Sequence, residues 1–130
     1  MQRVVASGLV SWDLSGADLQ FRNLSGRDFR DYNFRGANLS GVDFTGAHLE
    51  GANFSEADLT LATLDGAYLR GANLSWARLT GAYLYRADLT DANIDCMEID
   101  YGPREDDVCE LIDCVKVVRP QERVKVGVRG

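Results

Sequence analysis

The sequence predicts an all-β solenoid, and three observations carry this prediction. A large apolar residue recurs at every fifth position from Leu14 to Ile99 without a break. The residue two places before it is usually alanine, and every glycine between residues 11 and 100 lies two places after it. A period of five matches neither the 3.6-residue period of a helix nor the two-residue period of a strand, so neither element continues through the repeat. Short extended sides joined by bends and stacked coil on coil satisfy the pattern.

The length and charge of the chain limit the classes of protein to consider. At 130 residues it has room for one domain with a modest core. The 45% of hydrophobic residues argues against disorder, and no apolar run approaches the roughly 20 residues that span a bilayer. The net charge of −6 disfavours a direct nucleic-acid partner, because phosphate binding rests on clustered Lys and Arg. We expect a soluble protein with no membrane contact.

Residues 1–10 are interpreted as an N-terminal lead-in or cap. They lack the charged region and the continuous apolar region of a signal peptide, so we expect a cytoplasmic protein. The three cysteines, Cys96, Cys109 and Cys114, include no C-x-x-C pair and are expected to be reduced small apolar side chains. No metal site, cofactor or catalytic residue is predicted.

Each repeat is described here by its large apolar residue, at position i. Position i−2 is Ala in 12 of 18 repeats, and position i−1 is Asp or Asn in 12 of 18. Residues i−2 and i point inward, whereas i−1 points outward. Glycine at i+2 suits a corner because it tolerates backbone angles that other residues resist. The predicted central core consists of Leu39, Phe44, Leu49, Phe54, Leu59, Leu64, Leu69, Leu74 and Leu79.

Residues 11–100 resemble the pentapeptide-repeat family, whose motif is A(D/N)LXX. The segments Ala37-Asn38-Leu39-Ser40-Gly41 and Ala52-Asn53-Phe54-Ser55-Glu56 match it directly. The resemblance implies a right-handed quadrilateral β-helix with four repeats per coil, so that 18 repeats make about four and a half coils.

Residues 20 apart then stack in columns. One column, Asp13, Asn33, Asn53, Asn73 and Asn93, is expected to form a ladder of side-chain amide hydrogen bonds. Another, Arg30, Glu50, Arg70 and Thr90, alternates in charge and predicts a ladder of surface ion pairs.

Several residues depart from the repeat. Arg22 and Arg27 take the inward i−2 position, so we expect the first coil to be wider or to turn these side chains outward. Exposed apolar residues are predicted at the corners, namely Phe21, Leu61 and Trp76, and an aromatic cluster comprises Tyr68, Tyr83 and Tyr85. They form either a partner-binding patch or surface shielding. His48 stacks between Asp28 and Tyr68, but an acid–base role is set aside because a convex rod offers no pocket there.

The repeat stops after Tyr101, and residues 101–130 are predicted to cap the C-terminal end. Gly102-Pro103 breaks the pattern, and the spacing of Val108, Leu111, Ile112 and Val115 indicates an amphipathic helix over about 103–115. Residues 115–128 read as a hairpin. This segment belongs to the cap or joins two copies into a homodimer.

Two functions remain open, and neither is enzymatic. The first is an interaction or scaffold module with an unidentified protein partner. The second follows from the resemblance: some family members imitate duplex DNA, bind DNA gyrase or topoisomerase IV, and inhibit it or protect it from quinolones or other gyrase toxins. Residues 11–100 hold 14 acidic and 7 basic residues, a net −7 that favours such a mimic of a type II topoisomerase's DNA. The candidate partner surface comprises Asp18, Asp58, Phe21, Leu61, Trp76, Tyr83 and Tyr85.

Overall fold

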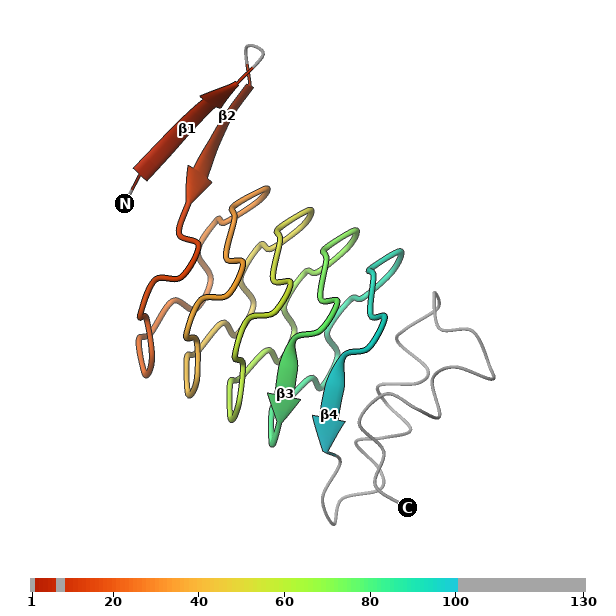
Figure 1. The fold of residues 1–130 in the computed structure, drawn as a ribbon. Coiled ribbons are helices and arrows are strands. Elements are labelled where there is room, and N and C mark those ends of the chain that lie inside the picture. The colour runs from red at the N-terminus through yellow and green to blue at the C-terminus, as the bar shows by residue number, and fades with distance from the viewer. Residues whose placement is uncertain (1, 7–8, 101–130) are drawn as a thin grey trace.

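The computed structural model describes residues 2–6 and 9–100, as a hairpin followed by a stack of coils (Figure 1). Strands β1 (Gln2–Ala6) and β2 (Leu9–Asp13) pair antiparallel, while β3 (Arg78–Thr80) and β4 (Glu98–Asp100) pair parallel. The predicted boundary between residues 10 and 11 falls inside β2. The predicted helix over 103–115 and hairpin over 115–128 lie outside the described residues.

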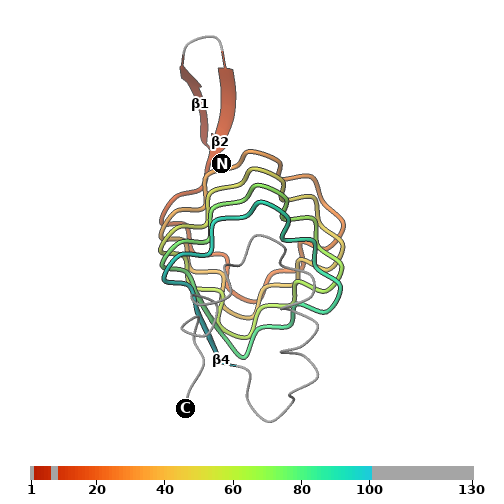
Figure 2. The ribbon, with the colours of Figure 1, turned by 90° about the vertical axis from the view of Figure 1, so that its right-hand side faces the viewer.

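The coils are joined by parallel bridges between residues 20 apart. Thirteen isolated bridges run from Asp13 with Asn33 to Asn73 with Asn93, and β3 pairs with β4 at the same offset. A coil of 20 residues holds four five-residue repeats. Figure 2, which looks along the stack, shows successive coils superimposed on one outline. The predicted all-β solenoid and its register are therefore confirmed, while the number of coils and the cap stay predictions.

Two regular backbone hydrogen bonds connect each side to its neighbours. The N–H at position i donates to a carbonyl 19 residues later, as from Leu39 to Asp58 at 2.7 Å. The N–H at i−1 donates to a carbonyl 21 residues earlier, as from Asn38 to Ala17 at 2.8 Å. Within a repeat, the N–H at i−2 closes a turn on the residue three places before, as from Ala37 to Phe34 at 3.0 Å. The backbone polar groups are thus satisfied along the rod.

Every corner position i+2 between residues 16 and 96 has a positive φ. Nine of these positions are glycines and eight are other residues, with φ between 57° and 71°. A left-handed conformation costs a residue with a Cβ about 1–2 kcal/mol, whereas glycine adopts it freely. The recurrence of glycine at i+2 is explained by this corner geometry.

The core is filled by the residues at i and i−2. Each of the nine predicted core residues is fully buried, and no polar or charged side chain is buried in the described part of the chain. Aromatic rings fill the early coils, where Phe34 and Phe54 stack with centroids 4.9 Å apart. Arg22 and Arg27 are exposed, as the cost of burying a guanidinium requires.

The predicted amide ladder is wrong as the main use of the i−1 side chains. All twelve Asp and Asn residues at i−1 accept a hydrogen bond from the backbone N–H two residues later, as Asn53 does from Ser55 at 2.9 Å. In the column that begins at Asp13, the described coils make one such bond between side chains, from Asn33 Nδ2 to Asp13 Oδ1 at 3.3 Å. An Asx turn wins because its donor is held close by the same repeat.

The predicted ion-pair ladder of Arg30, Glu50 and Arg70 is also wrong. Arg30 pairs with Asp28 of its own repeat at 2.7 Å, and Glu50 lies 3.4 Å from His48 Nδ1. Residues two apart in an extended segment project from the same face. Partners within a repeat are therefore nearer than partners in the next coil.

Candidate protein-interaction surface

Six large apolar side chains lie exposed on the rod. Because positions i and i−2 fill the core, a partner meets only the side chains at i−1, i+1 and i+2. The exposed set is Phe21, Leu61, Tyr68, Trp76, Tyr83 and Tyr85, with exposed fractions from 44% to 73%. The structure places these residues on different sides, so they do not form one surface.

Phe21 and Leu61 occupy one corner column in alternation with glycines. A Cβ built on Gly41 would lie 2.5 Å from Cε1 of Phe21, and one built on Gly81 would lie 2.8 Å from Cδ2 of Leu61. Each large side chain therefore lies against the glycine that takes the same corner one coil later. This corner is apolar over both pairs of coils.

Leu61 continues into an aromatic face on the adjoining side. Tyr83 and Tyr85 flank the buried Leu84, so chain alternation brings both rings to the outer surface. Tyr83 follows Gly81, on which Leu61 lies, by two residues. We call Leu61, Tyr83 and Tyr85 the late-coil patch.

The edge of the late-coil patch carries charge. The guanidinium carbon of Arg86 lies 5.3 Å from the centroid of the Tyr85 ring, within the range of a cation–π interaction. The Tyr85 N–H donates to Asp65 Oδ1 of the preceding coil at 3.0 Å. Arg86 was missed from the sequence, although its position directly after Tyr85 is the signal that identifies it.

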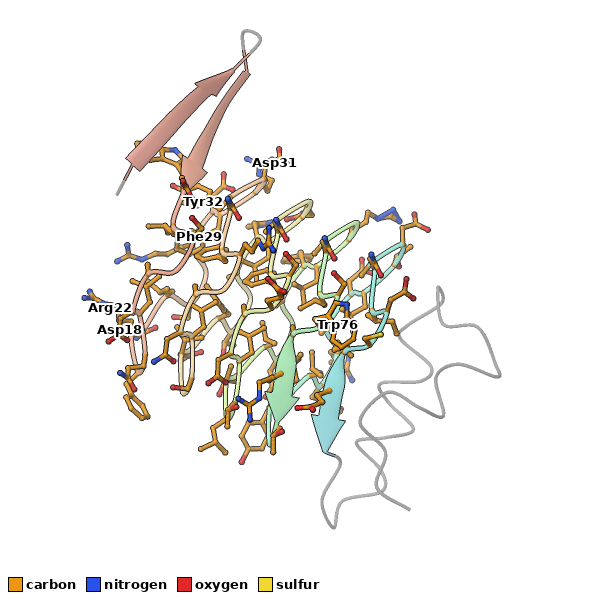
Figure 3. All side chains as sticks on the ribbon, in the orientation of Figure 1. Asp18, Arg22, Phe29, Asp31, Tyr32 and Trp76 are labelled. Atoms are coloured by element: carbon orange, nitrogen blue, oxygen red, sulfur yellow. The ribbon has the colours of Figure 1, made fainter. Side chains whose placement is uncertain are left out.

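Trp76 is separated from the late-coil patch by one whole side of the rod. The chain turns a corner at Trp76, runs along the side that contains β3, and turns again at Gly81. Figure 3 shows the Trp76 side chain near the start of β3. The sequence grouped Trp76 with the tyrosines, but the structure does not bring them together.

Asp18 and Asp58 share a column with residues that interrupt their charge. Bridges join Asp18 to Asn38, Asn38 to Asp58, and Asp58 to Arg78. Arg78 Nε lies 3.6 Å from Glu98 Oε1. The Asp58 carboxylate accepts hydrogen bonds from the N–H and the hydroxyl of Thr60, at 3.0 and 2.5 Å.

No bridge in the described coils pairs two acidic residues. The negative charge of the repeat is therefore spread over all sides, with neutral or basic residues between carboxylates. The continuous negative column expected of duplex DNA is not formed here.

The column through His48 forms a separate polar side. The His48 and Tyr68 rings stack with centroids 4.6 Å apart and an interplanar angle of 7°. Below them, the hydrogen bonds from Arg30 lower the pKa of the Asp28 carboxyl from 3.8 to about 2. The groups lie on an outward side, as their position in the repeat predicted.

Two searches of the described residues concern other kinds of site. No helix among them is long and apolar enough to cross a membrane. Within the same part of the chain, no group of three or more His, Cys, Asp or Glu side chains has a geometry that would hold a metal ion. Cys96 lies exposed as a free thiol.

Comparison with known structures returned several repeat proteins from cyanobacteria. HetL from Nostoc sp. strain PCC 7120, a pentapeptide repeat protein involved in heterocyst differentiation regulation, is 34% identical over 63% of this chain and 42% of HetL, with a TM-score of 0.50. Rfr23 from Cyanothece 51142 is 37% identical over 62% and 58% of the two chains, with a TM-score of 0.42. The protein alr5209 from Nostoc PCC 7120 is 29% identical over 90% and 83%, with a TM-score of 0.41.

The chain spans less than two thirds of the length of HetL and of Rfr23. A comparison with curated proteins gave no match. The family model for pentapeptide repeats, eight copies long, matches residues 13–51, 37–75 and 67–96. These matches cover the coils from the end of β2 to the last corner, and the chain belongs to the pentapeptide-repeat family.

Proposed function

We propose that this chain is a non-catalytic interaction module that binds a cytoplasmic protein partner through the late-coil patch. One observation carries the proposal: Leu61, Tyr83 and Tyr85 are 57%, 45% and 47% exposed although the core beneath them is complete without them. Tyrosine is enriched where proteins bind one another, and contiguous apolar groups on a surface are more informative than scattered ones.

The backbone at Leu61 supports the same proposal. Its φ is 61°, in the left-handed region that glycine occupies at most corners of this rod. A leucine in this conformation costs about 1–2 kcal/mol relative to a relaxed one, and it contributes nothing to the core. Strain that the fold does not need is typical of functional positions.

The relative HetL is consistent with an interaction role, since it is a pentapeptide repeat protein involved in regulation. The solenoid also favours such a role, because stacked repeats present long rigid surfaces on which side chains vary independently of the core. Which protein is bound depends on the outward side chains and not on the fold.

Imitation of DNA is the second candidate, and the net charge of −7 over residues 11–100 favours it. The distribution of that charge favours it less, because the bridged positions of the described coils never place one carboxylate on another. A gyrase supercoiling assay with and without a quinolone distinguishes the two. Inhibition or protection at micromolar protein, lost on Asp18→Lys with Asp58→Lys, would replace the first candidate by the second.

Site-specific photocrosslinking tests the proposed surface directly. A photoreactive phenylalanine derivative replaces Tyr85 in one variant and Tyr68 in a control, since both residues are exposed to similar degrees on different sides. Irradiation in cells of the source organism is expected to give a discrete heavier product from position 85 only. The same product from both positions, or from position 68 alone, would exclude the late-coil patch.

A further inference from the structure

The N-terminal end of the rod presents backbone groups that have no coil before them. In later coils the N–H and C=O of the i−1 residue bond to the preceding coil, as Asn38 N–H does to Ala17 and Asn38 C=O does from Leu19. Asp18, Asn23 and Asp28 hold this position in the first coil, and within the described chain they make no such bonds. Unpaired edges of this kind are templates for pairing with another chain.

The same end is partly apolar. Leu19 and Leu24 are only partly buried, whereas Leu39 and Phe44, which take their places one coil later, are fully buried. The β1–β2 hairpin stands outside the outline of the coils in Figure 2 and does not lie over this end. An apolar end with open edges would be expected to stack on a second copy.

Two arginines interrupt this apolar end. Arg22 and Arg27 occupy i−2, a position that Val42 and Ala47 fill one coil later with fully buried side chains. Both arginines are exposed, and neither forms an ion pair within the described coils. Figure 3 shows Arg22 projecting off the N-terminal end, away from the later coils.

We propose that Arg22 and Arg27 prevent the N-terminal end from stacking on the N-terminal end of a second copy. A two-fold axis would bring the open edges of two first coils together antiparallel, with four guanidinium groups between two apolar surfaces. Those groups would be desolvated beside charges of the same sign, which is strongly unfavourable. Inward-pointing charges of this kind are a known means of protecting open β-edges.

The test is the weight-average mass of full-length protein by analytical ultracentrifugation between 1 and 100 µM. The variant Arg22→Ala with Arg27→Ala restores the alanine that most repeats carry at i−2. We expect its mass at the highest concentration to be at least twice that of the wild type. The control Arg35→Ala with Arg70→Ala lowers the net charge equally and is expected to leave the mass unchanged.

A third variant shows which end associates. Ala17→Arg, added to Arg22→Ala with Arg27→Ala, puts one positive charge back at an i−2 position of the same coil and should restore the wild-type mass. A double variant that is folded by circular dichroism and keeps the wild-type mass would overturn the proposal, as would equal association of the control. If the double variant does not fold, Arg22→Gln with Arg27→Gln is measured against the same two outcomes.

Discussion

The ring of Phe21 lies on Gly41, the residue that takes the same corner one coil later. Cε1 of Phe21 would come within 2.5 Å of a Cβ at Gly41, where φ is +68°. Leu61 and Gly81 repeat the arrangement two coils on. A large corner residue is thus accommodated here by a glycine 20 positions later, which makes the choice of corner residues depend on the neighbouring coil.

Substitution at Gly41 measures this dependence. Gly36→Ala introduces strain alone, because φ is +66° and no atom lies within 4 Å of the new Cβ, and it should lower the free energy of unfolding by about 1–2 kcal/mol. Gly41→Ala adds a collision with Phe21 and should cost about 1 kcal/mol more. Urea unfolding gives both values, and in a Phe21→Ala background the two costs should become equal. Equal costs in the wild-type background would contradict the packing of Phe21 on Gly41.

The Asx turns are expected to contribute to stability individually. Asn53→Ala removes the acceptor for the Ser55 N–H and should lower the free energy of unfolding by about 1 kcal/mol. Thr63→Ala, at the same position of another repeat where the side chain accepts no such bond, should cost less than about 0.5 kcal/mol. Asn53→Asp keeps the acceptor and should stay close to wild type. Chemical denaturation of the three variants checks the order.

The stacked rings of the early core should be the most sensitive to truncation. Phe54 is fully buried and stacks on Phe34 at 4.9 Å with an interplanar angle of 4°. Phe54→Ala should cost about 3–5 kcal/mol, because it leaves a cavity between coils that cannot collapse freely. Phe54→Leu gives the residue that most repeats carry and should cost less than half as much. A loss below that of Phe54→Leu would contradict the described packing.

Acid should destabilise the protein through Asp28. Its pKa is lowered to about 2 in the folded protein, mainly by hydrogen bonds from Arg30, against an ordinary value of 3.8. A lowered folded pKa stabilises the fold above the ordinary value, and this contribution is lost as the pH falls from about 4 to 2. Arg30→Ala should return the pKa of Asp28 toward 3.8 and flatten the stability profile in that window. Carbon-detected NMR titration of the Asp28 carboxyl gives the pKa in both proteins.

The core and the register could be predicted from the sequence because both depend on spacing alone. A large residue at every fifth position has only one inward face to fill, so Leu39 and its equivalents had to be buried. The columns followed once residues 20 apart were taken as neighbours, as Asp18, Asn38 and Asp58 show.

The choice between competing polar partners could not be predicted in the same way. Asn53 has acceptors and donors within reach both in its own repeat and in the next coil, and small differences in distance decide which bond forms. Arg30 likewise chose Asp28 over Glu50. The β1–β2 hairpin was missed because it lies outside the five-residue period that organised everything else.

The most direct test of the proposed function is affinity capture with a surface variant that keeps the fold. Leu61→Thr with Tyr83→Thr and Tyr85→Thr is compared with wild type and with Tyr68→Thr, all checked for equal thermal unfolding midpoints. A partner bound through the late-coil patch should be retained by wild type and by Tyr68→Thr and lost at least about tenfold by the triple variant, since loss of a few central side chains removes most of a binding energy. Equal retention by all three proteins would contradict the late-coil patch as the binding surface.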